Sequence, residues 1–415
     1  MKPSGVPISP RIRFKEFGGA WEARPLGESF DERNERSGTG RLLSVTIGDG
    51  VIPASENGKR DNSSADKSNY KCVKTGDLAY NSMRMWQGAC GASAFDGIVS
   101  PAYTVLIPKE ETDSPFAERL FKRTEVLKIF QAYSQGLTSD TWNLKYPALS
   151  EIELAFPSLP EQRRIAELFR NLDETIAATD ARLEKLRQSK KSLLEKMFPR
   201  PGASVPEIRF KGFEGEWETR KLGEAFPDSI PNNTFSRAAL SDSGIVRNVH
   251  YGDVLIRYGS VLDVATAKMP FVGDAGFDPQ KQCLLRNGDI VIADTAEDSA
   301  VGKMIEIQGI HGEKVVSGLH TIALRPAKLF GKGFVGQYLN SESFHHQLLP
   351  IMQGVKVLSI GKKVLAETRL QIPSLPEQQR IGAFFCEFDK LIESVEKKVA
   401  KLRQVKSALL EEMFV

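Results

Sequence analysis

The sequence predicts an α+β protein with two globular domains, each followed by a long α-helix. The two helices are expected to pack as an antiparallel coiled coil with pseudo-twofold symmetry. Three observations predict this architecture. Two segments of the chain occur twice, the longer one carries coiled-coil spacing, and the regions between the repeats mix strand and helix patterns. A chain of 415 residues also exceeds one ordinary core and suits two or three domains.

The repeats set the domain boundaries. PRIRFKEFGGAWEARPLGE (10–28) matches PEIRFKGFEGEWETRKLGE (206–224) at 13 of 19 positions. Residues 156–199 match residues 372–415 without a gap at 21 of 44 positions, and both copies contain SLPEQ-x-R-I. The linker PRPGASVP (199–206) stops the first helix, because proline cannot continue it. The predicted order is a domain over 1–155, a helix over 156–199, a second domain with its linker over 200–371, and a helix over 372–415.

Both long repeats carry apolar residues that step by four and three alternately, which is the pattern of a coiled-coil seam. Neither helix can bury such a stripe alone, and the nearest complementary stripe is the other copy. A coiled coil used only for homodimerisation is the alternative, since periodicity does not identify the partner helix. The seam of the first copy is Ile165, Phe169, Leu172, Ile176, Thr179, Leu183, Leu186, Lys190, Leu193 and Met197, and that of the second is Ile381, Phe385, Phe388, Ile392, Val395, Val399, Leu402, Lys406, Leu409 and Met413.

Lys190 and Lys406 interrupt the two seams at the same step. A polar group at one seam position lowers stability but can fix register or orientation. The alternative is a lysine whose stem lies along the seam while its ammonium group reaches water.

The intervening regions, roughly 29–155 and 225–371, resemble each other only at short landmarks such as Gln135-Gly136 and Gln353-Gly354. The runs YTVLIP (103–108), GDIVIAD (288–294) and KMIEIQG (303–309) are rich in β-branched residues and read as strands. Helices are expected near 115–133 and 333–349.

Two segments carry side chains suited to nucleic acid. YNSMRMWQGACG and RNVHYGDVLIRYGSVLD combine Arg, Asn and Gln, which can pair with guanine or adenine edges. Lysines in Gly- and Ser-punctuated loops suit phosphate contact. For any one residue the alternative is a solvated surface side chain, and Trp86 is also a candidate core residue. The predicted DNA-binding residues are Lys59, Arg60, Lys67, Asn81, Arg84, Gln87, Thr138, Arg247, Asn248, Arg257, Tyr258, Lys268, Lys356 and Lys362.

Composition and missing motifs restrict the classes of function that the sequence allows. The formal charge is only +3, from 56 basic and 53 acidic side chains, so a polyanion-binding surface must be local. The four cysteines form no CxxC pair and stand at no zinc-ligand spacing, which predicts a reduced, cytoplasmic protein without a metal site. No signal peptide or span of 18 apolar residues is found. The chain also lacks a phosphate-binding loop and the tetrapeptide of amino-methyltransferases, so no catalytic site is predicted.

With these repeats, the sequence resembles the specificity subunit of type I restriction–modification systems. The doubled SLPEQ-x-R-I helix (158–165 and 374–381) carries most of the resemblance, and GDLAYNSMRMWQG (76–88) and GDIVIADTAEDSAVGK (288–303) look like its target-recognition segments. The resemblance covers essentially the whole chain.

The resemblance implies a non-catalytic protein. Each variable domain would read one half of a split DNA site, and the antiparallel helices would act as a spacer and dock two methyltransferase subunits. S-adenosylmethionine, ATP and Mg would bind partner subunits, including motor–nuclease subunits, and not this chain. The helix flanks around SLPEQ would be candidates for partner contact. The rival interpretations are a self-contained DNA modification or cleavage enzyme and a coiled-coil scaffold that binds only proteins.

Overall fold

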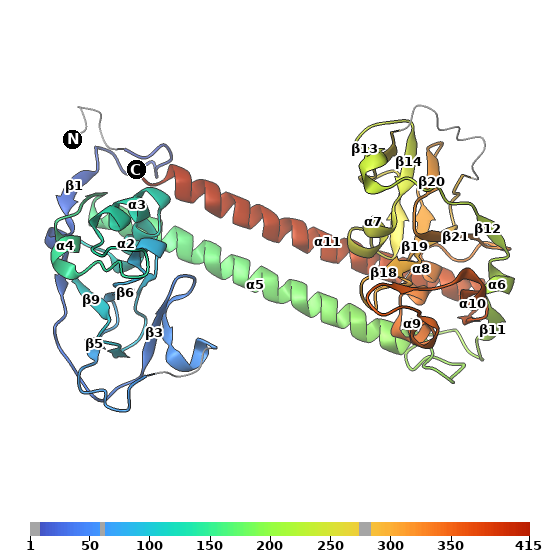
Figure 1. The fold of residues 1–415 in the computed structure, drawn as a ribbon, viewed down its shortest axis with the longest axis horizontal. Coiled ribbons are helices and arrows are strands. Elements are labelled where there is room, and N and C mark those ends of the chain that lie inside the picture. Colours follow the sequence, from blue (N-terminus) through green and yellow to red (C-terminus); the bar gives the residue numbers. More distant parts are fainter. Residues whose placement is uncertain (1–8, 59–62, 274–283) are drawn as a thin grey trace. The chain divides into compact units, whose positions relative to one another are not determined.

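A computed structural model describes residues 9–58, 63–273 and 284–415 (Figure 1). The chain forms two compact units. Unit 1 contains residues 1–179 and 399–415, and unit 2 contains residues 180–398. Helix α5 (Leu159–Met197) and helix α11 (Leu375–Glu412) each contribute to both units. In the described part of the chain, no helix is both long and apolar enough to cross a lipid bilayer.

Unit 1 is built on a four-stranded antiparallel sheet in the order β2-β9-β6-β7. The predicted strand over 103–108 is β9, and the helix expected near 115–133 is two helices, α2 and α3. The elements are β1 (Glu22–Pro25), α1 (Leu26–Ser29), β2 (Phe30–Glu32), β3 (Leu43–Thr46), β4 (Gly50–Pro53), η1 (Ala54–Glu56), β5 (Lys71–Val73), β6 (Leu78–Asn81), η2 (Met85–Gln87), β7 (Cys90–Ala92), β8 (Gly97–Val99), β9 (Tyr103–Pro108), α2 (Ser114–Phe121), α3 (Thr124–Tyr133), α4 (Tyr146–Ser150) and β10 (Glu153–Phe156).

Unit 2 has a five-stranded sheet in the order β12-β21-β17-β19-β15 and a four-stranded sheet in the order β13-β16-β14-β20. The predicted strands over 288–294 and 303–309 are β17 and β19. The elements are β11 (Glu218–Lys221), α6 (Leu222–Ala225), β12 (Asp228–Ile230), η3 (Arg237–Ala239), β13 (Leu240–Ser241), β14 (Val246–Val249), α7 (Tyr251–Ile256), β15 (Val261–Asp263), β16 (Phe271–Val272), β17 (Ile290–Ala293), β18 (Thr295–Ala296), β19 (Met304–Gln308), β20 (Lys314–Ser317), β21 (Thr321–Arg325), α8 (Phe334–Leu339), α9 (Glu342–His345), η4 (Leu349–Ile351), β22 (Leu358–Ser359), α10 (Lys362–Leu365) and β23 (Arg369–Ile372).

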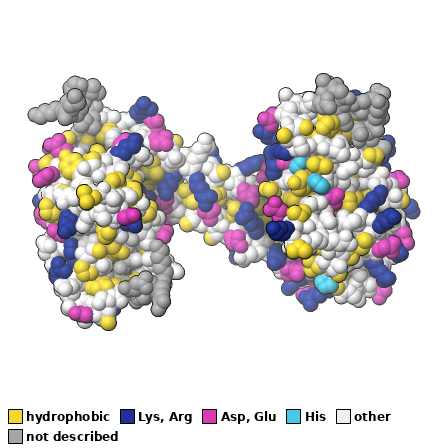
Figure 2. Space-filling view, in the orientation of Figure 1, with side chains coloured by type: hydrophobic (Ala, Val, Ile, Leu, Met, Phe, Trp, Pro, Cys, Tyr) yellow, Lys and Arg dark blue, Asp and Glu magenta, His cyan; other side chains and the backbone are white. Residues whose placement is uncertain are grey.

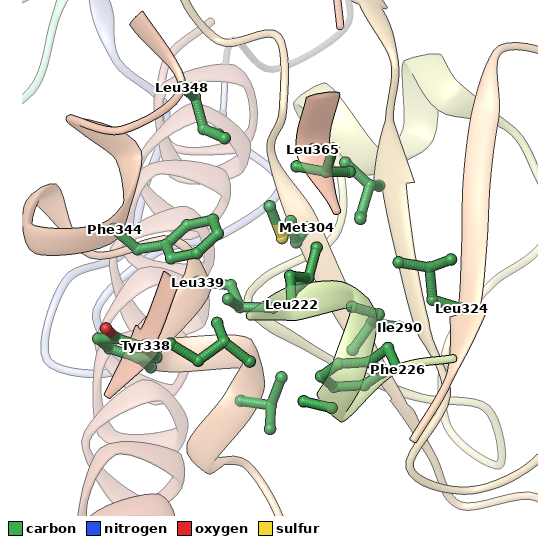
Figure 3. Packing of buried hydrophobic residues seen from close by; sticks show 14 of the residues in the cluster. Leu222, Phe226, Ile290, Met304, Leu324, Tyr338, Leu339, Phe344, Leu348 and Leu365 are labelled. Carbon is green, nitrogen blue, oxygen red and sulfur yellow. The ribbon is translucent and has the colours of Figure 1, made fainter. Parts of the chain in front are cut away.

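Each unit has its own hydrophobic core. In unit 2, one buried cluster contains Leu222 and Phe226, Ile290 and Met304 of the sheet, and Tyr338 of α8 (Figure 3). The predicted separation into two α+β parts is therefore confirmed, because the buried side chains form separate clusters within each unit.

The two long helices pack antiparallel within each unit. In unit 1 the end of α11 meets the start of α5, where the Phe414 and Phe169 rings lie 5.9 Å apart. In unit 2 the end of α5 meets the start of α11, where the Phe198 and Phe385 rings stack at 6.0 Å. Every predicted seam residue is buried or half-buried, so the intramolecular partner that the repeat suggested is confirmed.

The two seam lysines form matching ion pairs. Lys406 of α11 places its Nζ 2.5 Å from Oδ1 of Asp173 on α5. Lys190 of α5 places its Nζ 2.5 Å from Oδ1 of Asp389 on α11. The second pair lies at the repeat-equivalent positions of the first, with the roles of the helices exchanged. Each lysine is thus paired across the seam and does not simply reach for water.

Candidate nucleic-acid interface

In unit 1, three of the predicted residues, Asn81, Arg84 and Gln87, lie at or just after the end of strand β6. Asn81 is its last residue, and its side-chain Oδ1 accepts a hydrogen bond from the Met83 backbone N–H at 3.1 Å. The following turn η2 is anchored by the fully buried Met85 and ends at Gly88, whose φ of 83° lies in the left-handed region that glycine tolerates. The turn leaves Arg84 exposed between these anchors.

These side chains surround a hollow of about 510 Å³. Asn81, Arg84 and Gln87, which the sequence singled out, all line it. Arg84 has no ion-pair partner among residues 9–58, 63–273 and 284–415, so its guanidinium is available to a ligand. The polar and charged residues of the hollow that the sequence did not single out are Ser44, Thr46, Asp49, Asn57 and Tyr103. Tyr103 pairs with Asn81 across the β6–β9 ladder, so a correct strand register would have found it.

The remaining predicted residues of unit 1 lie in loops. Thr138 is exposed, and its backbone N–H donates to Thr141 Oγ1 at 3.1 Å. Lys67 is half-buried and donates through Nζ to the Ser64 carbonyl at 3.0 Å. Lys59 and Arg60 lie outside the described residues. Trp86 is half-buried, with its ring 5.2 Å from that of Trp142.

Two predictions for unit 2 need correction. Asn248 is fully buried, and its Oδ1 accepts from Asn233 Nδ2 at 2.7 Å. Tyr258 is also buried, and burial raises its pKa to about 12, with Asp253 adding to the shift. Neither side chain can reach a base edge from these positions. Their residue types suit base contact, but only the fold decides that strand β14 and the end of helix α7 point them inward.

The two arginines of the same segment are partly engaged by the protein. The Arg247 guanidinium donates to the Val264 carbonyl, which leaves the side chain half-buried. Arg257 is exposed and donates to Asp253 Oδ1 at 3.1 Å. Asp253 is buried and also accepts from Arg237 at 2.5 Å, so it is shared by two cations.

In unit 2, aromatic and imidazole groups lie at the end of strand β17. His320 Nδ1 lies 3.6 Å from Asp294 Oδ1, and its ring lies 5.3 Å from that of Tyr251. His320 has a φ of 54°, which is uncommon for a residue with a side chain and marks a tightly specified turn. Nothing in the local sequence distinguishes Tyr251 or His320, because Tyr251 begins helix α7, His320 precedes strand β21, and only the fold brings them together.

The predicted lysines of unit 2 are surface residues. Lys268, Lys356 and Lys362 are exposed, and none has an ion pair in the part of the chain that the structure describes. On the molecular face shown in Figure 2, basic and acidic side chains are interspersed. Any surface that contacts phosphate must therefore be a small part of the molecule, as the near-neutral formal charge requires.

The SLPEQ segments hold each helix to its own globular domain. Glu161 is buried and forms two hydrogen bonds with the Arg13 guanidinium, at 2.8 and 2.7 Å. Glu377 and Arg209 repeat this arrangement, at 2.7 Å for both bonds. Breaking a buried pair by removing one partner costs about 3–5 kcal/mol. The glutamates of the two SLPEQ segments thus have an internal role.

The neighbouring exposed residues of the repeats form a second matched feature. The Arg164 guanidinium lies 5.1 Å from the Phe14 ring centroid, and that of Arg380 lies 5.3 Å from the Phe210 ring. Ile12 and Ile208, two residues before these rings, are 45% and 40% exposed. We call each set, Ile12–Phe14–Arg164 and Ile208–Phe210–Arg380, a repeat patch. Both patches keep the same three residue types at the surface.

Comparisons with known proteins agree with this organisation. A family model described as "Type I restriction modification DNA specificity domain" matches residues 50–188 and 214–404. The type I restriction enzyme MjaVIII specificity subunit of Methanocaldococcus jannaschii is 22% identical over 296 residues, which cover 68% of this chain and 67% of that protein.

Two solved structures share the fold. The S subunit of the type I restriction–modification system from M. genitalium matches with a TM-score of 0.55 and 15% identity, over 98% of this chain and 99% of that chain. A chain from a structural study of complex assembly and conformational transition in a type I R-M system matches with a TM-score of 0.52 and 18% identity, over 95% and 97%. Since the family model matches both halves and well over half of the residues, the chain belongs to the type I restriction–modification DNA specificity family.

Proposed function

We propose that this chain is the DNA-recognition subunit of a type I restriction–modification complex and that each globular unit reads one half of a split DNA site. One observation carries the proposal. The units share their frame, from the Arg–Glu pairs to the helix seam, yet differ at the strand ends where exposed polar groups gather. Unit 1 presents Arg84, Asn81 and Gln87, whereas unit 2 presents Tyr251 and His320.

Different side chains on the same frame suit different half-site sequences. Arg pairs with guanine through two hydrogen bonds, and Asn or Gln pairs with adenine in the same way, each worth about 1–3 kcal/mol of discrimination. Lys268, Lys356 and Lys362 supply phosphate contacts that fix position without reading sequence. The methyltransferase subunits would add further phosphate contacts and bind S-adenosylmethionine, while ATP and Mg would belong to the motor–nuclease subunits.

The coiled coil is the proposed spacer between the half-sites. Helix α5 has 39 residues, which at 1.5 Å per residue is about 58 Å. That length corresponds to roughly 17 base pairs of B-DNA at 3.4 Å each. The paired seam lysines support a helix pair of fixed register, which a spacer requires.

The repeat patches are the proposed docking surfaces for two copies of the methyltransferase subunit. Their residues are the same in both units, and although Phe14 and Phe210 pack partly against the cores, the isoleucines and arginines stay exposed, so one type of partner surface fits both. A charged rim beside aliphatic and aromatic side chains is typical of a protein interface.

Selection from a random DNA library tests the recognition proposal. The chain with its methyltransferase subunits is expected to enrich one split sequence at physiological salt. Arg84→Ala should weaken binding about tenfold and relax one base position in one half-site only, because one guanidinium contact is lost. Arg170→Ala, an exposed arginine on helix α5, is the matched control. Enrichment of no sequence by the unaltered complex would contradict the proposal.

A further inference from the structure

Two aliphatic side chains are exposed almost completely at matching places in the two units. Leu137 has a relative exposure of 101% and Val355 of 98%, the highest values among the large hydrophobic residues that the structure describes. Exposed apolar residues scattered singly need no explanation. Here the same feature occurs twice, directly after the repeated Gln135-Gly136 and Gln353-Gly354.

Both residues lie at the start of a closed loop. Gln135 and Asn143 exchange two backbone hydrogen bonds, at 3.0 and 2.8 Å, and Gln353 and Ser359 do the same at 2.9 and 2.8 Å. The glycine that begins each loop has a positive φ, 143° at Gly136 and 117° at Gly354.

Glycine is required at both positions. A Cβ at Gly136 would lie 2.6 Å from the Thr141 carbonyl oxygen, and one at Gly354 would lie 2.0 Å from that of Val357. The backbone of each loop is therefore constrained at its glycine. The exposure of the aliphatic side chain follows from this constrained backbone and not from a loose loop.

Each loop is fastened to the strand end that carries the candidate base-reading groups. The Leu144 backbone N–H donates to the Ser82 carbonyl at 2.9 Å, directly after strand β6. The Ile360 N–H donates to the Asp294 carbonyl at 2.9 Å, directly after strand β17. In unit 1 the contact between the Trp142 and Trp86 rings adds a second attachment, and in unit 2 strand β22 pairs with β18.

The surroundings favour a nucleic acid over a protein as the occupant. Residues 350–366 contain Lys356, Lys362 and Lys363 and no acidic residue. In unit 1, residues 82–90 contain Arg84 and no acidic residue, and the Leu137 loop itself contains one, Asp140. A partner protein bound in two copies would meet the same residues twice, as at the repeat patches. The loops instead differ in length and in their residues, Leu-Thr-Ser against Val-Lys-Val.

We propose that Leu137 and Val355 are specificity-determining residues that each pack against the C5-methyl group of a thymine in the major groove of their own half-site. An aliphatic side chain beside Arg, Asn and Gln gives a unit an apolar contact that reads thymine and polar contacts that read the other bases. This inference rests on the proposed function, since it assigns residues to the same DNA-reading face.

Thymine-to-uracil substitution tests the contact directly. The complex with its methyltransferase subunits is titrated with its split site, in which the thymine of each A·T pair is replaced by uracil one position at a time. One position in each half-site is expected to weaken binding about fourfold, the effect of one buried methyl group. Leu137→Ala should weaken binding to the thymine site by a similar factor and remove the sensitivity at one position, while Val355→Ala does so in the other half.

Leu329→Ala is the matched control, because Leu329 is 73% exposed and follows strand β21 at the end opposite Thr321. Three outcomes would overturn the inference. These are equal sensitivity to uracil in wild type and Leu137→Ala, a half-site without an A·T pair, or a variant that binds DNA normally but loses methyltransferase subunits. If the wild-type complex prefers no split sequence, the proposed function itself fails.

Discussion

Single residues explain why the repeats keep particular side chains. Glu161 and Arg13 belong to different repeats in the same half and meet in a largely buried pair, and Glu377 and Arg209 meet in the same way. Gln162 donates to the Pro157 carbonyl at 2.8 Å at the start of helix α5, as Gln378 does to Pro373. Both arrangements use backbone carbonyls or residues of the repeats themselves, so the variable regions can change around them.

His250 makes unit 2 sensitive to mild acid. Burial lowers its pKa below the usual 6.5, with Arg237 and His320 nearby and Asp253 acting in the opposite direction. The unfolded chain therefore binds more protons than the folded chain just below pH 6.5, so stability falls as the pH drops through this range. The urea midpoint of unfolding should decrease between about pH 7.5 and 5.5 in the wild type, and less so in His250→Asn.

Asparagine is the suitable replacement because His250 Nδ1 accepts from the Gly252 backbone N–H at 3.2 Å, and an amide oxygen can take over this capping role. Parallel pH curves for the two proteins would show that another group causes the loss.

Part of the candidate site could be predicted from local sequence. Asn81, Arg84 and Gln87 fall on one turn after a strand, so their neighbourhood follows from spacing alone. The assignment of Asn248 and Tyr258 to DNA contact is wrong, because burial depends on which side of a short strand or helix faces the core. Tyr103, Tyr251 and His320 were missed because pairing of distant segments brings them to the site.

Among the elements, the seam ion pairs give the helix pair its alignment. An apolar seam alone tolerates a shift of one heptad, but a shift would separate Lys190 from Asp389 and leave two half-buried charges without their ion pair. Asp389 also accepts from Gln337 Nε2 of helix α8 at 2.7 Å. Asp173 likewise binds Arg119 of helix α2 at 2.5 Å. Each aspartate thus connects the helix pair to the globular part of its unit.

Reversing one seam pair tests this role. Lys190→Asp should lower the free energy of unfolding by about 2 kcal/mol, since it places two carboxylates together in the seam. The double variant with Asp389→Lys should recover about 1 kcal/mol of that loss, as coupled neighbours do in a double-mutant cycle. Urea denaturation of the four proteins measures the coupling, and Lys406 with Asp173 provides an independent copy. Strictly additive losses would contradict a direct interaction.

The long helices were the most predictable elements. Helix α5 extends over 159–197, against an expectation of 156–199, because an apolar stripe of more than four heptads dominates local preferences. The expected helix near 333–349 is broken into α8, α9 and η4, since Asn340 uses its side chain to bind the Met304 N–H and carbonyl of the adjacent strand. A single sequence does not reveal such tertiary competition.

In the molecule as a whole, the repeated segments build the same framework in both units, and the regions between the repeats differ. The cores of both units are closed by an aromatic residue at the end of a long helix, Phe414 in unit 1 and Phe198 in unit 2. Both phenylalanines are buried beside a tryptophan of the short repeat, Trp21 and Trp217. The repeated residues thus serve the frame and the repeat patches.

The repeat patches predict a stoichiometry. Arg164→Glu should reduce the number of bound methyltransferase subunits from two to one, because it reverses the charge of one patch only. Combining it with Arg380→Glu should remove both. Native mass spectrometry of the reconstituted complex counts the subunits, and Arg170→Glu is the control because position 170 is Arg in one copy and its equivalent, 386, is Cys. Retention of two subunits by the double variant would place docking elsewhere.

The distribution of the four tryptophans gives the protein an optical asymmetry. Trp21 and Trp217 are buried in equivalent cores, whereas Trp86 and Trp142 lie half-buried against each other at the candidate face of unit 1. Unit 2 has no indole at its own face, since its only tryptophan is Trp217. Changes in intrinsic fluorescence on ligand binding would therefore report on one half of the molecule. The chain carries a built-in probe by which engagement of the first unit can be followed separately from that of the second.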